Sequence, residues 1–267
     1  MAGNLFDLTG KYAYITGGTK GIGRAIAEAF ADHGAIFALT GRNADDAERV
    51  AAAINKRVDR KAAFGFAADL ADRPGLIASY DAAAGRFGRI DILVCNAAAL
   101  PGIFGKAEDS PPEEYSRLLE WNIINNVALI NHAAMAMKAR RDGVILVTSS
   151  GSGLHPVENT VPYGVSKAGI GFFVRAVAAE LAPYNVRINA VSPGMTRSDA
   201  LEERMRVAPD RIKKLMEQVP LRRFIEPKEI AAGMVFLASE GGKAVSGQTI
   251  AMEAGEFGTG VGWDRPV

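Results

Sequence analysis

The sequence predicts an α/β fold, a single domain built on a seven-stranded, doubly wound parallel sheet with helices on both faces. Two observations predict it. Short runs rich in Val, Ile, Phe and Ala alternate with longer Ala-rich stretches of helical periodicity, which is the pattern of repeated β–α units. The short runs are also nearly continuous in apolar residues, as expected of parallel strands covered on both faces.

The elements follow one another in order. The seven expected strands are YAYIT (12–16), AIFALT (35–40), AAFGFA (62–67), DILVCN (91–96), GVILVTS (143–149), VRINAVS (186–192) and QTIAME (248–253). A helical pattern follows each of the first five strands, and the fifth of these helices carries YGVSK. Residues 195–225 interrupt the alternation after the sixth strand. We expect this segment to be helical, either a flap over a substrate or a solvated insertion.

Composition and charge exclude several classes of protein. The chain has 267 residues, of which 48% are hydrophobic, and 31 Lys and Arg nearly balance 30 Asp and Glu. Nothing in this balance indicates a nucleic-acid or membrane surface. One cysteine and three scattered histidines offer no metal-ligand spacing, so no metal site is expected. Neither a signal peptide nor an apolar run of about 18 residues is present, so we expect a cytoplasmic protein.

The glycine-rich stretch TGGTKGIG (16–23) joins the first strand to the first helix. In this position Gly17 suits a tight turn, Gly21 lets the backbone approach a diphosphate, and Gly23 lets the helix pack closely. The N-terminus of the following helix offers free N–H groups to phosphate. A P-loop would require Gly-Lys-Ser/Thr, which is absent. The stretch therefore predicts a dinucleotide site in a Rossmann fold.

The end of the second strand predicts which dinucleotide binds. It reads Thr40-Gly41-Arg42-Asn43 and lacks the acid that holds the ribose 2′-hydroxyl in NAD enzymes. Arg42 and Lys20 are cations suited to a 2′-phosphate. Asp45 and Asp46 come next, but they suit the first turn of a helix. NADP(H) is therefore favoured over NAD(H).

Five motifs in order resemble the short-chain dehydrogenase/reductase family over essentially the whole chain. TGGTKGIG fits the TGxxxGxG turn of that family, and Tyr163 and Lys167 fit its YxxxK pair. Ser150 stands thirteen residues before Tyr163, which is the usual spacing, and Asn122 fits the active-site asparagine. Ser192-Pro193-Gly194 fits the loop that meets the nicotinamide. The resemblance implies a catalytic tetrad of Asn122, Ser150, Tyr163 and Lys167.

The resemblance also implies further contacts. Asp69 falls where the family has an aspartate near the adenine. The residues expected to bind the cofactor are Gly17, Thr19, Lys20, Gly21, Ile22, Gly23, Arg42, Asp69, Leu70, Asn96, Ala97, Tyr163, Lys167, Pro193, Gly194 and Thr196. The residues expected near the substrate are Ser150, His155 and Met195, although His155 also suits a plain loop position. A homotetramer or a dimer is expected, formed through the helix of Tyr163 and the long helix before it.

One motif departs from the family pattern. Cys95-Asn96-Ala97-Ala98 stands where the family has Asn-Asn-Ala-Gly. Because the first asparagine helps to brace the central sheet, the replacement by Cys95 puts that polar bracing in doubt. We interpret Cys95 as a small buried residue rather than a reactive thiol.

The YGVSK motif suggests how a proton is moved. Tyr163 and Lys167 lie four residues apart and so share one helix face. At about 4 Å and an effective dielectric near 20, an ammonium stabilises a phenolate by about 4 kcal/mol. This predicts that Lys167, with help from an oxidised nicotinamide, lowers the pKa of Tyr163 by up to about three units. Ser150 is expected to hold the substrate oxygen, while Asn122, by resemblance, positions a water that connects Lys167 to solvent.

The favoured function is NADPH-dependent reduction of a ketone or 3-oxoacyl carbonyl, or the reverse oxidation. One alternative is an NAD-linked dehydrogenase of a sugar, steroid or hydroxyacyl substrate. Another is a catalytically silent cofactor-binding sensor or scaffold. A serine hydrolase is excluded because no GxSxG surrounds Ser150. The 195–225 segment carries cations that suit either an acidic or carrier-bound substrate or a solvated face, namely Arg197, Arg204, Arg206, Lys213 and Lys214.

Overall fold

A computed structural model of the chain describes residues 4–100, 102, 105–207 and 209–256, apart from the side chains of 199, 200, 203, 204, 211, 215 and 218. Its seven strands form one parallel sheet in the order β3-β2-β1-β4-β5-β6-β7. They are β1 (Tyr12–Ile15), β2 (Ile36–Gly41), β3 (Ala63–Ala67), β4 (Ile92–Cys95), β5 (Gly143–Thr148), β6 (Val186–Pro193) and β7 (Thr249–Met252). The predicted fold class is confirmed, and every expected strand is present.

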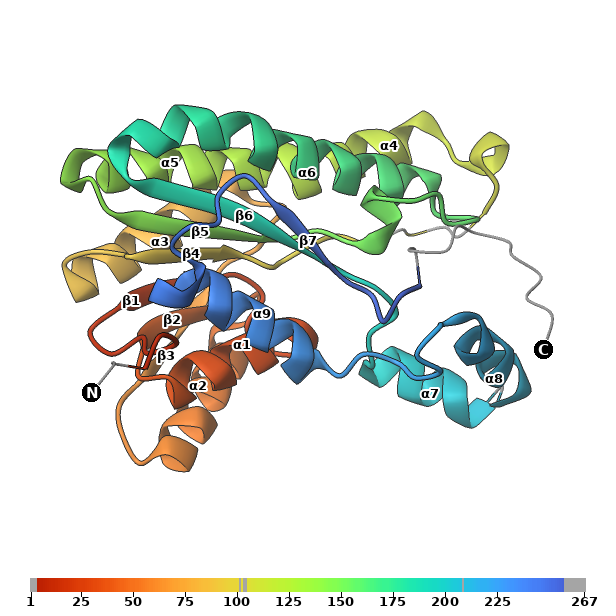
Figure 1. Ribbon diagram of the computed structural model, residues 1–267, viewed down its shortest axis with the longest axis horizontal. Helices are drawn as coiled ribbons and strands as arrows, with labels where there is room; N and C mark the ends of the chain where they lie inside the picture. Colours follow the sequence, from red (N-terminus) through yellow and green to blue (C-terminus); the bar gives the residue numbers. More distant parts are fainter. Residues whose placement is uncertain (1–3, 101, 103–104, 208, 257–267) are drawn as a thin grey trace.

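Helices cover both faces of this sheet. They are α1 (Gly21–Asp32), α2 (Ala44–Val58), α3 (Arg73–Phe87), α4 (Pro112–Leu119), α5 (Asn126–Arg140), α6 (Val161–Leu181), α7 (Asp199–Val207), α8 (Pro209–Gln218) and α9 (Pro227–Ala238). In Figure 1, α5 and α6 lie above the sheet, and α1, α2 and α9 lie below it. No helix within the described residues has the length and apolar character to cross a bilayer.

The hydrophobic core has two parts because helices cover both faces of the central strands. Leu93 in β4 and Ile145 in β5 pack with α3, α5 and α6 on one face, whereas the next residues, Val94 and Leu146, pack with α1 and α9 on the other. All four side chains are essentially fully buried. Alternation of side chains along a strand therefore demands apolar residues at consecutive positions, which explains the continuous apolar runs of the sequence.

The strand order places the functional loops together. The chain runs outward from β1 to β3 and then returns to β4 on the other side of β1. Such a reversal opens a crevice at the carboxyl ends of the strands, where doubly wound proteins bind ligands. Short one-turn helices and irregular segments follow β4, β5 and β6 at this edge. Helices α7 and α8 also lie there, beyond the end of the sheet (Figure 1).

Candidate active site

The glycine turn after β1 forms as predicted. Gly17 and Gly21 have φ of 65° and 55°, in the left-handed region that favours glycine. A Cβ on Gly23 would lie 2.0 Å from the carbonyl oxygen of Gly17, so only glycine fits. Helix α1 then begins after Lys20 with no side-chain cap and no acid in its first turn. Its first N–H groups are therefore left for a ligand such as a diphosphate.

Asn96 braces this turn against the central sheet. The Asn96 side-chain nitrogen donates to the carbonyl oxygens of Thr16 and Gly17, at 3.2 Å each. The backbone nitrogens of Asn96 and Ala97 both donate to the Thr16 hydroxyl at 2.9 Å, and the Thr148 hydroxyl donates to Asn96 Oδ1 at 3.1 Å. The doubt raised by the Cys95 substitution is thus answered, because one asparagine ties β1, β4 and β5 together.

Cys95 is buried in the core on the α3–α5 face. Burial raises the pKa of its thiol to about 12, so the thiolate that reacts or binds metal is scarce at neutral pH. The structure supports the interpretation of Cys95 as a small core residue.

The part of the site expected to hold the adenosine of the cofactor lies beside β2. A Cβ on Gly41 would lie 2.6 Å from Thr19 Cγ2, so the end of β2 touches the glycine turn. Arg42, the next residue, is exposed, and its guanidinium makes no hydrogen bond or ion pair with other described residues. Asn43 caps α2 by accepting from the backbone nitrogens of residues 45 and 46. Those two aspartates therefore occupy the first turn of α2, as the sequence indicated.

Asp69 and Leu70 follow β3 on the same side of the edge. Asp69 is exposed and its carboxylate accepts from the Ala71 backbone nitrogen at 3.0 Å. The Leu70 carbonyl oxygen accepts from Asn125 Nδ2 at 2.8 Å, and Arg73 Nε donates to Asn125 Oδ1 at 2.7 Å. Asn125, which the sequence did not single out, therefore fixes this loop to the segment that carries Asn122.

Asn122 lies in a π-helical segment, Glu120–Asn125, that joins α4 to α5. The sequence predicted one long helix here. π-Helical turns are rare in proteins, but those that occur often lie at functional sites. The Asn122 side chain is 2% exposed, and its amide group bonds both backbone groups of Ala99, at 2.7 and 3.0 Å, and the Ser166 hydroxyl at 3.1 Å. Asn122 thus holds the loop after β4 against α6.

Tyr163 and Lys167 share the inner face of α6, as predicted. Lys167 is 3% exposed, and its Nζ donates to the Thr148 carbonyl oxygen at 2.9 Å and lies 5.6 Å from the Tyr163 ring centroid. Ser150, which follows β5, forms a hydrogen bond with Tyr163. Three of the four predicted catalytic residues therefore converge, and Asn122 reaches them through Ser166, whose hydroxyl donates to the Tyr163 carbonyl oxygen at 2.7 Å.

The lowering of the Tyr163 pKa that the sequence predicted with an oxidised nicotinamide stays a prediction, because burial acts in the opposite direction in this structure. Burial raises the pKa of Tyr163 above its usual 10, and the hydrogen bond with Ser150 offsets only part of that rise. Burial also lowers the pKa of Lys167 from 10.5 to about 8. The prediction from the sequence counted the attraction between the two charges and no cost of desolvation, whereas desolvation disfavours the charged form of both groups.

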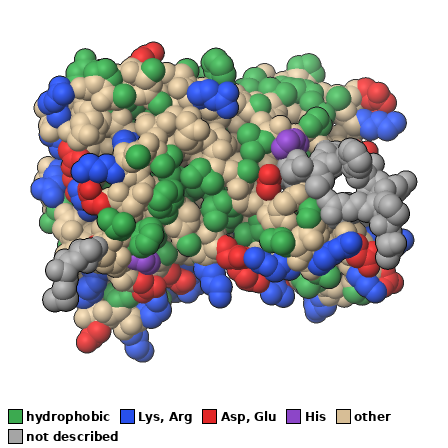
Figure 2. Space-filling model, in the orientation of Figure 1, with side chains coloured by type: hydrophobic (Ala, Val, Ile, Leu, Met, Phe, Trp, Pro, Cys, Tyr) green, Lys and Arg blue, Asp and Glu red, His purple; other side chains and the backbone are tan. Residues whose placement is uncertain are grey.

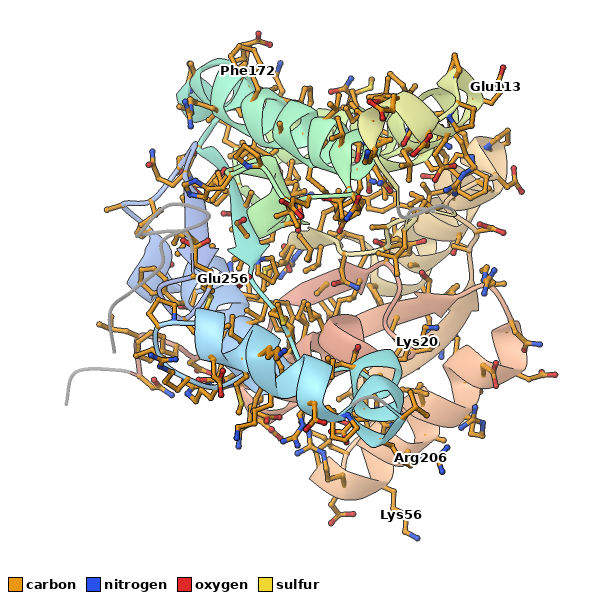
Figure 3. All side chains as sticks on the ribbon, turned by 90° about the vertical axis from the view of Figure 1, so that its right-hand side faces the viewer. Lys20, Lys56, Glu113, Phe172, Arg206 and Glu256 are labelled. Atoms are coloured by element: carbon orange, nitrogen blue, oxygen red, sulfur yellow. The ribbon has the colours of Figure 1, made fainter. Side chains whose placement is uncertain are left out.

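The end of β6 provides the remaining expected contacts. Pro193 closes the strand, and the Gly194 backbone nitrogen donates to the Met252 carbonyl oxygen at 3.0 Å. Thr196 donates its hydroxyl hydrogen to the Gly194 carbonyl oxygen at 3.0 Å. Figure 3 shows this edge of the molecule, with Lys20 on one side of it and Glu256 on the other. The sequence did not single out Glu256, whose carboxylate accepts from the Met195 backbone nitrogen at 3.1 Å.

One of the cations of 195–225 is paired with carboxylates of the described residues. Arg197 pairs with Glu202 at 2.6 Å and with Glu226 at 3.0 Å, so its charge is already matched. Lys213 and Lys214 are exposed on α8. The side chain of Arg204 lies outside the described residues.

Comparisons with known proteins agree with this architecture. A family model described as enoyl-(acyl carrier protein) reductase matches residues 17–256. D-threitol dehydrogenase of Mycolicibacterium smegmatis is 35% identical over 252 residues, which covers 94% of each chain. The chain belongs to the short-chain dehydrogenase/reductase family. The 7α-hydroxysteroid dehydrogenase of Escherichia coli (strain K12) is 34% identical over 248 residues, 93% of this chain and 94% of that one.

Solved structures of short-chain dehydrogenase/reductases superpose closely. A 7α-hydroxysteroid dehydrogenase complexed with NADH and 7-oxo glycochenodeoxycholic acid has a TM-score of 0.86 and 33% identity, covering 94% of this chain and 96% of that chain. A relative from Beutenbergia cavernae that carries NADP at low occupancy has a TM-score of 0.87 and 30% identity, covering 96% and 100%. The chain is therefore an NAD(P)-dependent oxidoreductase of CH–OH and C=O groups.

Proposed function

We propose that the protein catalyses NADPH-dependent reduction of a ketone or 3-oxoacyl carbonyl to an alcohol, or the reverse oxidation. The observation that carries the proposal is the convergence of Ser150, Tyr163 and Lys167 at the sheet edge that also holds the glycine turn. A path of hydrogen bonds links these catalytic residues to the glycine turn. It runs from Lys167 to the backbone of Thr148, and from the Thr148 side chain through Asn96 to Gly17.

The chemistry follows from the groups on the page. When bound, the nicotinamide cofactor supplies the hydride. Tyr163 is protonated at neutral pH, as an ordinary phenol is, and so carries the proton that the forming alkoxide needs. Ser150 donates a hydrogen bond to the same oxygen. The buried ammonium of Lys167 stabilises the tyrosinate that remains, and Asn122 holds the α4–α5 connection against α6.

A phenylalanine at position 163 tests the catalytic role. We expect Tyr163→Phe to lower kcat by about 10²–10⁴-fold, the usual contribution of a general acid, while NADPH still binds as measured by fluorescence titration. Tyr184→Phe is the matched control, because Tyr184 is exposed and only stacks under Lys138. If Tyr163→Phe turns over at the wild-type rate, the catalytic assignment fails. A wild-type protein that binds NADPH and reduces no carbonyl favours the sensor or scaffold alternative.

Preference for NADP(H) rests on Arg42 and Lys20. Both are exposed at the glycine turn, and the contact between Gly41 and Thr19 brings Arg42 to the place where a 2′-phosphate would lie. Arginine binds phosphate bidentately, and no acid stands at the end of β2 to repel it. The solved relatives include both an NADH complex and an NADP complex, so the choice belongs to the residues of this chain.

Charge reversal at Arg42 tests that preference. We expect Arg42→Asp to lower kcat/KM for NADPH by about 10–100-fold, the worth of a charge-assisted hydrogen bond, and to leave NADH unchanged or improved. Lys56→Asp is the control. It makes the same change of charge on α2, and Figure 3 shows Lys56 at a distance from Lys20. If the ratio of kcat/KM for NADPH to that for NADH is unchanged, the assignment of Arg42 to the 2′-phosphate is wrong, whereas a wild type that prefers NADH supports the alternative of an NAD-linked dehydrogenase.

Helices α7 and α8 are proposed to cover the substrate. They follow the β6 loop directly, and the backbone pairing of Thr196 with Ile225 joins the two ends of the segment. Arg197 holds α7 to the start of α9 through Glu202 and Glu226. The small-molecule carbonyl or alcohol would then lie between this flap and Ser150. Limited proteolysis with and without NADPH and substrate tests the proposal, which predicts slower cleavage within 197–222 in the ternary complex.

A homotetramer or dimer is proposed as the working assembly. Phe172 on α6 and Met135 on α5 are 71% and 73% exposed, which is unusual for large apolar side chains. Figure 3 shows Phe172 on the outer surface of α6. β7 is an edge strand, and hydrophobic side chains gather on the face formed by β7 and α9 (Figure 2). Sedimentation of the wild type and of Phe172→Asp tests the interface. The cytoplasmic location remains a prediction.

A further inference from the structure

Two carboxyl groups and a histidine gather at the substrate end of the edge, outside the catalytic tetrad. Glu253 and Glu256 follow β7, and both pack against Gly194 at the end of β6. A Cβ on Gly194 would lie 2.8 Å from Glu253 Cβ and 2.7 Å from Glu256 Oε2. His155, in the segment between Ser150 and Tyr163, lies close enough to Glu253 to lower the pKa of its carboxyl. This acid–histidine cluster therefore joins the ends of β5, β6 and β7.

One carboxylate oxygen of this cluster is buried and accepts no hydrogen bond from the described residues. Glu256 uses Oε2 to accept from the Met195 backbone nitrogen at 3.1 Å. Glu253 Oε2 is buried and has no hydrogen-bond partner among the described residues. Such an atom is costly to leave unpaired. Burial accordingly raises the pKa of both carboxyls, and repulsion from Glu253 adds to the rise at Glu256.

A second buried polar atom without a hydrogen-bond partner lies on β6. Ser192 is 0% exposed, and its hydroxyl has no partner within the described part of the chain. Ser192 alternates along β6 with Ala190, which packs against α6, so its side chain falls on the α6 face of the sheet. That is also the face of Tyr163 and Lys167. Two unsatisfied polar groups, one from β6 and one after β7, thus point to a polar ligand beside the catalytic residues.

We propose that Glu253, which packs with Glu256 against Gly194, accepts a hydrogen bond from a second hydroxyl of a neutral, polyhydroxylated substrate and disfavours substrates that carry a carboxylate. The inference rests on the proposed alcohol–ketone chemistry and deepens it by naming the substrate class. The open oxygen of Glu253 is a hydrogen-bond acceptor, so a neutral hydroxyl donor suits it. A substrate carboxylate would face Glu253 and Glu256 and be repelled.

Three four-carbon alcohols test the inference, because they differ only in polar groups. D-threitol has four hydroxyls, 2-butanol has one, and 3-hydroxybutyrate has one hydroxyl and a carboxylate. We expect the wild type, with NADP⁺, to prefer D-threitol. Glu253→Gln should lower kcat/KM for D-threitol by roughly 10- to 100-fold, leave 2-butanol within about 3-fold, and raise the rate with 3-hydroxybutyrate relative to D-threitol.

Two controls separate a specific loss from a general one. Glu158→Gln removes an exposed carboxylate from the same segment as His155 and should change none of the three rates. The rate with 2-butanol reports whether each variant is folded and binds cofactor, and Glu253→Asp should restore part of the D-threitol rate.

The outcomes distinguish this inference from the proposed function. If Glu253→Gln changes D-threitol and 2-butanol equally, or neither, the inference is overturned while the alcohol–ketone chemistry stands. A wild type that oxidises 2-butanol and shows no preference for D-threitol overturns the inference alone. A wild type inactive with all three alcohols, and with their ketones and NADPH, overturns both.

Discussion

At the carboxyl ends of the strands, one half of the candidate site is formed by backbone groups and the other half by side chains. At β1 and β2 the site consists of backbone, with Gly17 in a left-handed conformation, Gly23 too close to Gly17 for any side chain, and the uncapped start of α1. At β5 to β7 it consists of side chains from distant parts of the chain, such as Ser150, Lys167 and Glu253. A backbone site leaves a local pattern in the sequence, whereas a side-chain site is assembled only by folding.

The two halves are coupled through Asn96 and Thr148. Asn96 holds the glycine turn, and Thr148 bonds Asn96 with its hydroxyl and Lys167 with its carbonyl oxygen. A change in one half is therefore expected to reach the other along this path. Four substitutions, from the largest expected effect to the smallest, test whether the halves are as different as they look.

The backbone half should tolerate no side chain at Gly23. An added Cβ would lie 2.0 Å from Gly17 O and 2.4 Å from Asn96 Nδ2. We expect Gly23→Ala to lower the free energy of unfolding by about 3 kcal/mol, at the upper end of overpacking costs, and to abolish stabilisation by NADPH in thermal unfolding. Gly85→Ala is the control, since its Cβ would meet no atom within 4 Å. It should stabilise α3 by up to about 1 kcal/mol. Normal NADPH binding by Gly23→Ala would contradict the backbone account.

In the half of the site formed by side chains, the buried ammonium of Lys167 should make the free energy of unfolding depend on pH. The pKa of Lys167 is lowered from 10.5 to about 8 in the folded protein, so the unfolded state binds more protons between these values. The Lys167 contribution to the free energy of unfolding should therefore increase with pH across this window, by about 3 kcal/mol. Below pH 8 the full penalty of the buried ammonium remains.

The measurement must isolate Lys167, because other groups titrate in the same range. Burial raises the pKa of Cys95 and Tyr80 to about 12, so their contributions fall as pH rises past the unfolded values near 9 and 10. Denaturant unfolding of the wild type and Lys167→Met at pH 7.5, 9 and 10.5 gives the difference directly. If the difference between the two proteins is independent of pH, Lys167 is not the buried cation described here.

Asn122 tests the connection between the halves. Asn122→Ala leaves both backbone groups of Ala99 and the Ser166 hydroxyl without their partner. We expect a loss of about 2 kcal/mol in the free energy of unfolding and a fall in kcat larger than the change in KM for NADPH. Ser116→Ala is the control, because that exposed hydroxyl bonds only the carbonyl oxygen of Pro112 one turn earlier. An equal effect of the two substitutions would remove the special role of Asn122.

The smallest effect is expected at Arg197. Its two ion pairs, with Glu202 and Glu226, are partly exposed, and such pairs contribute about 0–1 kcal/mol each. Arg197→Gln should therefore lower the melting temperature by no more than a few degrees, while proteolysis within α7 becomes faster. A large fall in melting temperature would show that the flap is part of the core rather than attached to it.

The fold was predictable to the level of every strand. Continuous apolar runs separated by helical patterns indicate a parallel sheet covered on both faces, and the paired burial of neighbours such as Leu93 and Val94 is the physical cause of that pattern. The π-helical turn around Asn122 was not predictable, because its apolar pattern is that of an ordinary helix. It is maintained by bonds to Ala99 and Ser166, which are distant in sequence.

The sequence by itself predicted the candidate residues of the site, namely the glycine turn, the YGVSK pair and the cations at Lys20 and Arg42, because each prediction depends on residue type at a short spacing. The tertiary structure alone decided how those residues are charged and what surrounds them. Burial raises the pKa of Tyr163, and the lack of a side chain at Gly194 lets Glu253 pack against the end of β6. Desolvation and proximity are properties of the packed fold, and a stretch of five residues carries no record of either.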